Sequence, residues 1–562
     1  MSREKRQRKK MTEKGGAKTG RRPSAVELPE KLCHAGVYLF LFAFVALYVF
    51  YAPEGYIQIA TNKYRFYRKM ALITGGIMIP LIALQYLFAF RKRNRGEKKL
   101  RISATDILMF LFLVVNCVTF FLTPYKEEAL WGTSGWYMGF AMMLSFIGIY
   151  FLISRFYDGK IDLLVPIMAV TAAVFLWGLL NRFSVYPVDM QYDNVIFISS
   201  IGNINWFCGY WSVFFAIGIV LYIIAEDRRL RIIAAVHSVL SLAMGVVEGS
   251  DSAYISIGVV FFFLFLLSFR KTVYMKRWLD ECIFLCGSCQ VMRVIAAFGP
   301  EEIEPEYIGW TGLNLVTPTI GLMLGNLTLI ALIIFILFRL LLERADKRYG
   351  DRGMEQGQWI KSILWLKYTV VGLVASSAIV YLTLLIINTR TPGILGPLSR
   401  YKVFLFDGSW GSNRGTTWRD GLAVYQTLPL RERLFGVGQD CFSIYGYSVP
   451  ELAARFEEEW PTSRLTNAHN ECITFLVDLG VFGLITFVGI FAGCFKRLIV
   501  KGAKEPLCYV FAVSLLSYFF HNQFSFSQVV NIPYIFLMFG LAENLMRKID
   551  DGLEKQRKRQ SF

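Results

Sequence analysis

Long apolar runs separated by short polar stretches extend along most of the chain. The hydrocarbon layer of a bilayer is about 30 Å thick, so a helix that spans it needs roughly 20 mostly apolar residues. Runs of this length recur between Cys33 and Met546, and they predict about fourteen transmembrane helices in an all-α integral membrane protein. The expected ranges are 33–51, 70–90, 105–123, 134–154, 161–181, 206–225, 230–248, 253–269, 279–299, 317–342, 361–389, 469–495, 506–523 and 528–546.

The polar stretches divide the chain into tails, membrane segments and one large loop. We expect a basic tail over 1–32, helices one to eleven over 33–389, the loop over 390–468, helices twelve to fourteen over 469–546 and a second tail over 547–562. The loop contains no spanning run and mixes acidic, basic, aromatic, Gly and Pro residues. This composition predicts an ordered cap on one membrane face.

Composition and charge agree with this organisation. Hydrophobic residues make up 55% of the chain, which does not describe a water-soluble globule. The net charge of +18 comes from Lys and Arg residues in alternate short loops and in both tails. By the positive-inside rule, both termini are cytoplasmic and the large loop is extracytoplasmic. We expect the basic tail to meet anionic membrane lipid and not nucleic acid. Lys63, Arg65, Arg68 and Lys69 break the rule, because this topology places them in an outer loop.

Three cysteines have a spacing that resembles an iron–sulfur motif. Cys282, Cys286 and Cys289 are spaced C-x3-C-x2-C within the apolar run DECIFLCGSCQVM. Spacings of four and three place them on one face of a helix, where small side chains allow close packing in a membrane. We therefore predict no metal site and no cofactor.

Polar residues gather in three segments that the topology places on the same outer side. The segments are Gly202–Tyr210, Gly249–Tyr254 and Asp407–Asn470. Because ionisable groups are costly in hydrocarbon, polar residues that share one membrane face predict a shared functional site.

The third segment carries an ordered series of motifs, and these resemble a known family. An Arg four residues before a Trp is followed by Pro-Leu, by Gly-x-Gly-x-x-x-Phe, and by His-Asn leading into acid-x-Gly-x-x-Gly. This order is similar to the C-terminal region of the O-antigen ligase and O-antigen polymerase superfamily. The matching positions are Arg414, Trp418, Pro429, Leu430, Gly436, Gly438, Phe442, His469, Asn470, Asp478, Gly480 and Gly483.

Two further elements bear on this resemblance. Gly202-Asn203-Ile204-Asn205 is similar to the family's Gly-Asn-Pro-Asn element, with Ile204 in place of Pro. At GSDSAY the chain departs from a Ser-Arg-Gly-like element that is frequent in the family. Asp251 or a neighbour stands there in place of an outer-face arginine.

The resemblance implies a lipid-carrier (GT-C-like) glycosyltransferase fold at the outer face of the cytoplasmic membrane. Such enzymes move a glycan from an undecaprenyl-diphosphate-linked donor to the hydroxyl of a glycan, lipid or protein acceptor. Polymerisation of repeat units and ligation of a finished glycan both remain open, and a flippase or chain-length regulator is a possible partner. No paired carboxylates flank a nucleophile site, so direct displacement with inversion is the simplest mechanism.

Negative charge grows on the departing diphosphate, and arginine suits it because its planar guanidinium stays charged and binds phosphate oxygens bidentately. Arg414 is the main candidate, and cations that neutralise the diphosphate would make a divalent metal unnecessary. Its possible helpers are Arg400, Lys402, Arg419 and Arg464. The alternative is a solvated loop surface on which these residues pair with Asp407, Asp420 and Glu457 to Glu459.

The acceptor hydroxyl must lose a proton, and His469 is the candidate base because an unperturbed imidazole is largely neutral near pH 7. We expect Asn467 to be the N-cap and His469 to lie in the first turn of the twelfth span. His469 would then share a helix face with Ile473, Leu476, Gly480 and Gly483. The alternative is an interfacial histidine satisfied by loop carbonyls.

Five other residues are candidate substrate-binding groups: Asn203, Asn205, Asp251, Asn470 and His521. The asparagines at 203 and 205 have a competing interpretation as helix caps, and Asp251 has one as a hairpin-turn residue. His34 and His237 are interpreted as structural.

Two other classes of function remain open. A lipid-linked glycan flippase or transporter would need charged or broken segments in mid-membrane, whereas here polar groups gather at one face. A scaffold that kept the fold and lost activity is the third possibility.

Overall fold

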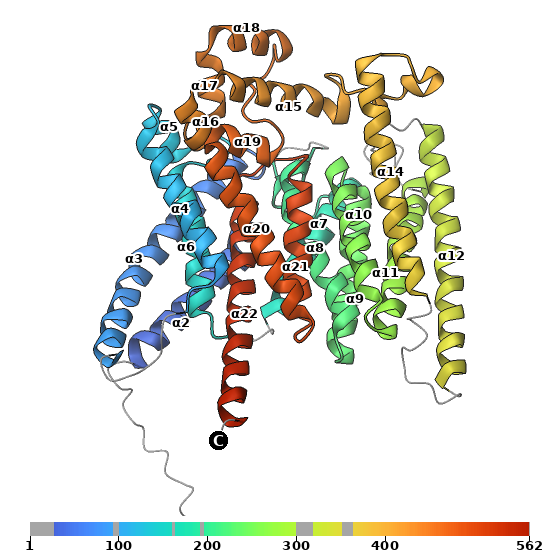
Figure 1. Cartoon of the computed structure of the whole chain (residues 1–562), viewed down its shortest axis with the longest axis horizontal. Coiled ribbons are helices and arrows are strands. Elements are labelled where there is room, and N and C mark those ends of the chain that lie inside the picture. The colour runs from blue at the N-terminus through green and yellow to red at the C-terminus, as the bar shows by residue number, and fades with distance from the viewer. Residues whose placement is uncertain are drawn as a thin grey trace, which may run out of the picture.

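The computed structural model describes residues 27–93, 101–159, 163–191, 196–298, 318–350 and 363–560. Within them, long helices form a bundle that carries a smaller helical layer at one end (Figure 1). The two-stranded sheet pairs β1 (Phe197–Ile198) with β2 (Gly202–Asn203) in antiparallel register, with Phe197 opposite Asn203. The helical class predicted from the hydropathy pattern is confirmed.

The first part of the bundle runs from α2 to α14. Its helices are α2 (Glu27–Phe42) with the π-helix η2 (Ala43–Tyr48), α3 (Ile59–Arg93), α4 (Ala104–Leu122), α5 (Lys126–Trp131), α6 (Phe140–Phe156), α7 (Leu164–Arg182), α8 (Ile204–Ile224), α9 (Arg228–Val247), α10 (Asp251–Ser268), α11 (Thr272–Phe298), α12 (Pro318–Gly350) and α14 (Leu364–Arg390).

The chain then forms the terminal layer, which we call the cap, and returns to the bundle. The cap comprises η5 (Gly396–Arg400), η6 (Lys402–Phe404), α15 (Trp410–Thr427), α16 (Leu430–Phe435), α17 (Phe442–Ser448) and α18 (Pro450–Glu459). The returning helices are α19 (Glu471–Asp478), α20 (Gly480–Gly502), α21 (Cys508–His521) and α22 (Ile532–Gln560). The cap and the end of α22 lie at opposite ends of the molecule (Figure 1).

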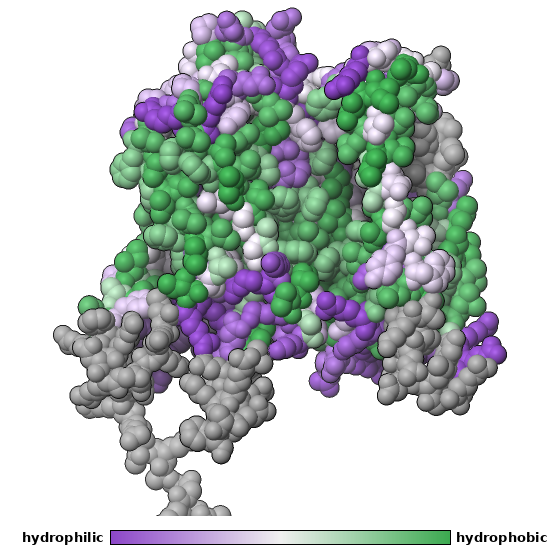
Figure 2. All heavy atoms as spheres, in the orientation of Figure 1, coloured by the Kyte–Doolittle hydropathy of each residue, from purple (hydrophilic) through white to green (hydrophobic). Residues whose placement is uncertain are grey.

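Ten helices among the described residues are long and apolar enough to cross a membrane, and the shorter α6 and α21 are also apolar. Each predicted span range overlaps a described helix, and the protein is a multi-pass membrane protein. The total of about fourteen spans remains a prediction. Figure 2 shows an apolar band between two polar ends, one of which is the cap.

Burial distinguishes the central helices from the peripheral ones. In α8, 89% of the apolar window is buried, and α8 packs against α9 and α21. In α14 the corresponding share is 0%. A helix that is apolar on all sides, and that no other part of the protein covers, requires lipid or another apolar surface around it. The bundle therefore has its core around α8 and its rim at α12 and α14.

The basic residues that broke the charge rule do not lie in a loop. Lys63, Arg65, Arg68 and Lys69 belong to α3, which begins at Ile59. The fully buried Lys63 Nζ donates to Tyr48 O at 3.2 Å and to Val49 O at 2.9 Å. It thereby satisfies carbonyls at the end of the preceding helix, which lack intrahelical partners. The expected loop placement is wrong, because these four residues begin the next helix.

The cap has its own apolar core, and this core extends onto α19. Val424, Phe442 and Phe456 are buried together with Ala468 and Val477, which flank the site segment. Asp440 Oδ2 accepts hydrogen bonds from Thr133 N at 2.7 Å and Met138 N at 3.1 Å, and so joins the cap to the α5–α6 connection. The cap is therefore anchored to the bundle at more than one point.

The predicted span 469–495 is two helices, because the chain breaks between α19 and α20. Gly480 has a φ of +69°, and a Cβ there would lie 2.4 Å from Leu434 C and O. A residue with a side chain fits neither the conformation nor the space. The glycine therefore lets α16 approach the junction, and the apolar span starts at Gly480, not at His469.

The three closely spaced cysteines lie on α11, as expected. Cys282 and Cys286 are buried, Cys289 is half-buried, and all three are free thiols. The described residues contain no group of three or more His, Cys, Asp or Glu side chains placed to hold a metal ion.

Candidate functional site

His469 lies in the segment between the cap and α19 and is not helical. Asn470 is the N-cap of α19, and its Oδ1 accepts a hydrogen bond from Ile473 N at 2.9 Å. His469 has a φ of 48°, and its N–H donates to Asn467 Oδ1 at 2.9 Å. The predictions that Asn467 caps this helix and that His469 begins it are wrong, because the cap is Asn470. The helical stripe proposed through His469 and Ile473 fails for the same reason.

Arg414 follows a left-handed turn near the start of α15. Gly411, Ser412 and Asn413 form that turn, with φ values of 57°, 56° and 70°. Arg414 Nη1 donates to Gly411 O at 3.2 Å and to Ser412 O at 3.3 Å, and its Nε donates to Phe524 O at 3.0 Å. The guanidinium is therefore held between the cap and the loop that follows α21.

The loop that follows α21 also contacts the segment that contains His469 and Asn470. The ring of Phe526 packs edge-on against the ring of His469, with a centroid distance of 5.0 Å. Asn470 Nδ2 donates to Gln523 O at 2.9 Å. Residues 523–526 therefore hold the two segments that carry the predicted base and the predicted phosphate-binding arginine.

His521, at the end of α21, lies beside these groups. Its ring is fully buried, and its Nδ1 shares a hydrogen bond with Asn522 Oδ1 at 2.6 Å. Both His469 and His521 lie within range of the positive charge of Arg414. The structure thus brings one guanidinium and two imidazoles together at the cap end of the bundle.

Burial lowers the pKa of His469 to about 4, with a further contribution from the charge of Arg414, while a hydrogen bond of the ring to the Asn467 backbone opposes the shift. The imidazole is therefore neutral near pH 7 and can accept a proton. Its Nδ1 is buried and has no hydrogen-bond partner among the described residues. The hydrogen bond of the ring to the Asn467 backbone agrees with the alternative of a histidine held by a loop carbonyl, so both interpretations of His469 stay open.

A buried carboxyl group adjoins this histidine. Glu471 Oε1 accepts hydrogen bonds from Tyr518 OH at 3.2 Å and from Ser527 Oγ. Burial raises the pKa of Glu471 to about 8. These bonds join the first turn of α19 to α21 and the following loop, so Glu471 helps to fix the segment that presents His469.

The hairpin between α9 and α10 reaches the same region. Asn203 is the N-cap of α8, with its Oδ1 accepting from Asn205 N at 2.9 Å, as the capping interpretation predicts. Asn205 Oδ1 accepts from Ser250 Oγ at 3.2 Å. Asp251 Oδ2 accepts from Ser412 Oγ at 3.1 Å and so bonds to the turn before Arg414. The three polar segments expected on one face do meet.

An arginine that the sequence analysis did not single out lies against this hairpin. Arg182, the last residue of α7, donates from Nε to Val247 O at 2.7 Å. A Cβ at Gly249 would lie 2.8 Å from Arg182 Nη2. The arginine missing from GSDSAY is thus matched in space by one from another helix. The sequence gave no sign that Arg182 lies there, because α8 and α9 separate Arg182 from the hairpin along the chain.

Two of the other predicted arginines, Arg419 and Arg464, have partners within the cap. Arg419 Nη2 pairs with Glu459 Oε1 at 2.8 Å, as the alternative of a paired loop surface predicts. Arg464 Nε donates to Ser443 Oγ at 2.9 Å, and its guanidinium lies 4.4 Å from the ring centroid of Tyr447. Arg400 ends η5, and its side chain lies outside what the structure describes.

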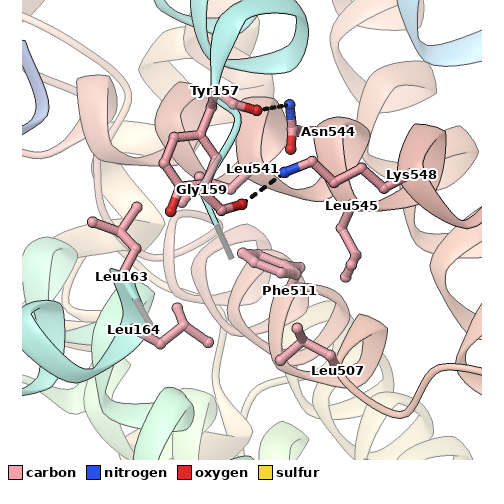
Figure 3. A pocket seen from close by; sticks show the side chains of 10 residues that line it. All are labelled: Tyr157, Gly159, Leu163, Leu164, Leu507, Phe511, Leu541, Asn544, Leu545 and Lys548. Atoms are coloured by element: carbon pink, nitrogen blue, oxygen red, sulfur yellow. Dashed lines mark hydrogen bonds between the residues drawn. The ribbon is translucent and has the colours of Figure 1, made fainter. Parts of the chain in front are cut away.

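A separate cavity of about 80 Å³ lies near the start of α21, away from the His521 end (Figure 3). Asn544 Nδ2 donates to Tyr157 O at 2.7 Å, and Lys548 Nζ donates to Gly159 O at 2.7 Å. Both polar side chains are therefore engaged with backbone carbonyls. The rest of the lining is mainly apolar, namely Leu163, Leu164, Leu507, Phe511, Leu541 and Leu545.

Fold and site together define a multi-pass α-helical membrane protein with a helical cap, and with arginine and histidine side chains converging beneath that cap. Residues 313–488 match the family model described as O-antigen ligase, which confirms the resemblance to the O-antigen ligase and polymerase superfamily over this region. The match includes Arg414, His469 and Asn470. The match covers this region alone and shows that it is similar to the O-antigen ligase family. No curated protein matches the chain.

Proposed function

We propose that this protein transfers a glycan from an undecaprenyl-diphosphate-linked donor to an acceptor hydroxyl at the outer face of the cytoplasmic membrane. The observation that supports this most directly is the convergence of Arg414 and His469 on residues 523–526. A cation beside a neutral imidazole provides the two groups that the reaction needs. The acceptor is a glycan, a lipid or a protein hydroxyl, and the chain works with a flippase or a chain-length regulator.

Arg414 is proposed to bind the diphosphate. As the anomeric C–O bond breaks, negative charge accumulates on the leaving diphosphate, and a fixed guanidinium stabilises that charge more than it stabilises the ground state. Arg414 is half-buried, which strengthens this interaction relative to bulk water. With this guanidinium at the diphosphate, we propose that no divalent metal is required.

His469 is proposed to take the proton of the attacking acceptor hydroxyl. Acceptor oxygen then bonds to the anomeric carbon as the carrier diphosphate leaves, and the configuration inverts. A general base contributes typically about 10²–10⁴ in rate, so Arg414 and substrate positioning must provide the rest. A bound diphosphate would also offset the Arg414 charge and raise the pKa of His469, making it a stronger base when donor is present.

The direct test is glycan transfer by the purified protein in proteoliposomes with a polyprenyl-diphosphate-linked oligosaccharide. We expect wild-type product formation, no detectable product with His469→Ala, and weakened donor use with Arg414→Ala, all at normal membrane abundance. His34→Ala is the matched control, because His34 bonds Phe156 O at 2.6 Å, remote from residues 523–526. Wild-type turnover in His469→Ala would remove the base role, and EDTA-sensitive transfer would contradict metal independence.

The same preparation separates transfer from transport. Carrier that crosses the bilayer without bond formation would support the flippase alternative and contradict the proposal. Mass spectrometry of a deletion strain then separates the two transferase reactions. Accumulated single repeat units indicate a polymerase, and long unattached chains indicate a ligase.

A further inference from the structure

The turn that presents Arg414 is unfavourable in isolation. Gly411, Ser412 and Asn413 are consecutive left-handed residues, and two of them carry side chains. Residues with a Cβ avoid this region, because the Cβ crowds the following carbonyl oxygen. Such a turn persists only where surrounding contacts hold it. The contacts of the turn therefore determine where Arg414 lies.

One of these contacts comes from a membrane helix. Asp251 is the first residue of α10, and its Oδ2 accepts a hydrogen bond from Ser412 Oγ at 3.1 Å. Arg414 is bound to the same turn through Gly411 O and Ser412 O. A continuous set of hydrogen bonds thus runs from α10 through Ser412 to the guanidinium.

We propose that Asp251 is a positioning residue that ties the cap to α10 through Ser412 and so fixes the guanidinium of Arg414 over the site. The chain departs from its family at this position, and the carboxylate found there acts on the arginine and not on the substrate. This inference rests on the proposed function, since the arginine is positioned for the donor diphosphate.

Physical reasoning favours a tether over direct substrate binding. Asp251 Oδ2 is occupied by Ser412, while Oδ1 is buried and has no partner among the described residues. A carboxylate facing an anionic diphosphate would repel it. Toward Arg414, by contrast, the charge of Asp251 is attractive. A hydrogen bond to a charged group is also among the stronger ones that a side chain can make.

The test is a double-mutant cycle in the glycan transfer assay. Asp251→Ala and Ser412→Ala should each lower kcat/KM for the donor by about tenfold, or about 1.4 kcal/mol, and leave the acceptor KM unchanged. The double variant should lose the same factor of about ten and not a hundred, because both changes remove one shared interaction. Asp251→Asn should retain most of the activity, because its amide oxygen can still accept from Ser412.

Ser409→Ala is the matched control. Ser409 Oγ donates to Asp407 Oδ1 at 2.8 Å, an equivalent bond at the same helix start that does not reach α10. Donor use in this variant should equal that of the wild type. Full activity in Ser412→Ala, or additive losses in the double variant, would overturn the tether. Loss in Asp251→Asn equal to that in Asp251→Ala would overturn it in favour of a charge role.

A measurement independent of transfer checks the contact itself. The pair Asp251→Cys and Ser412→Cys should form a disulfide under oxidation, seen as a linked peptide by mass spectrometry, and the linked protein should still use donor. Absence of the link would overturn the proposed contact. If the wild type transfers no glycan at all, the proposed function fails together with the positioning role. If the wild type is active and Ser412→Ala is unimpaired, only the positioning role fails.

Discussion

His469, the proposed base, owes its neutral state to its surroundings and not to a position in a helix. Its left-handed backbone, with its N–H bonded to Asn467, turns the residue out of the helical path. Burial and the Arg414 charge keep the ring neutral. A neutral imidazole beside a guanidinium is the state that proton abstraction next to an anionic leaving group requires.

The pH dependence of donor use should report this coupling. The proposed base role needs a neutral His469, so activity should be lost as the pH falls through its pKa. With a pKa of about 4, kcat/KM should be flat at neutral and mildly acidic pH and should fall only near pH 4. The Arg414→Gln variant lacks the positive charge that lowers the pKa of His469. The acidic limb of the residual activity of this variant should therefore move to higher pH.

Arg414→Lys provides the control for that profile, because it keeps the positive charge and should keep the acidic limb where it is. The measurement is residual kcat/KM against pH for the wild type and both variants. A wild-type limb near pH 6.5, or equal limbs in the two variants, would contradict the coupling between Arg414 and His469.

At the scale of elements, the break between α19 and α20 determines where the site lies relative to the membrane. Had the two helices been one, α19 would have continued the apolar span, with His469 directly before its N-cap. Instead, Gly480 turns the chain against Leu434 of α16, and α19 packs against the cap core. The site segment is therefore supported by cap and bundle together.

Gly480→Ala should weaken this junction. The left-handed conformation alone costs about 1–2 kcal/mol for a residue with a Cβ, and contact with Leu434 adds to that cost. We expect a lower thermal unfolding midpoint in detergent together with reduced transfer. Gly148→Ala in α6 is the control, because nothing lies within 4 Å of the added Cβ. Equal midpoints for the two variants would show that the junction tolerates a side chain.

At the scale of the molecule, the cap and the C-terminal end of α22 face opposite sides of the apolar band (Figure 1, Figure 2). The basic loops predict that the α22 end is cytoplasmic, which places the cap and the site outside. A site there can meet a carrier whose glycan is already on the outer side. This sidedness is what an extracytoplasmic transferase requires.

Cysteine labelling tests the sidedness. On intact spheroplasts, a membrane-impermeant maleimide should label Glu457→Cys, which is exposed on α18 of the cap. It should label Asp551→Cys, exposed near the end of α22, only after permeabilisation. The unsubstituted chain, with its ten native cysteines, sets the background. The reverse pattern would place the site in the cytoplasm and contradict the proposed donor topology.

The sequence by itself determined the membrane class, the large loop and the residues Arg414, His469, Asn470, His521 and Asp251 that the structure gathers at one end. The membrane class and the loop follow from span length and polar clustering, which are local properties of the chain set by the thickness of a bilayer and the cost of burying charge. Arg414, His469 and Asn470 were identified by motifs that resemble those of a known family.

Only the tertiary structure decided that Asn470 caps α19, that Arg182 lies against the α9–α10 hairpin, and that Phe524 and Phe526 hold the arginine and the histidine. It likewise assigned Arg419 to an ion pair with Glu459. These facts depend on contacts between segments far apart in sequence, and a helix end or an ion pair forms where packing brings its partners together. No local pattern of residues carries that information.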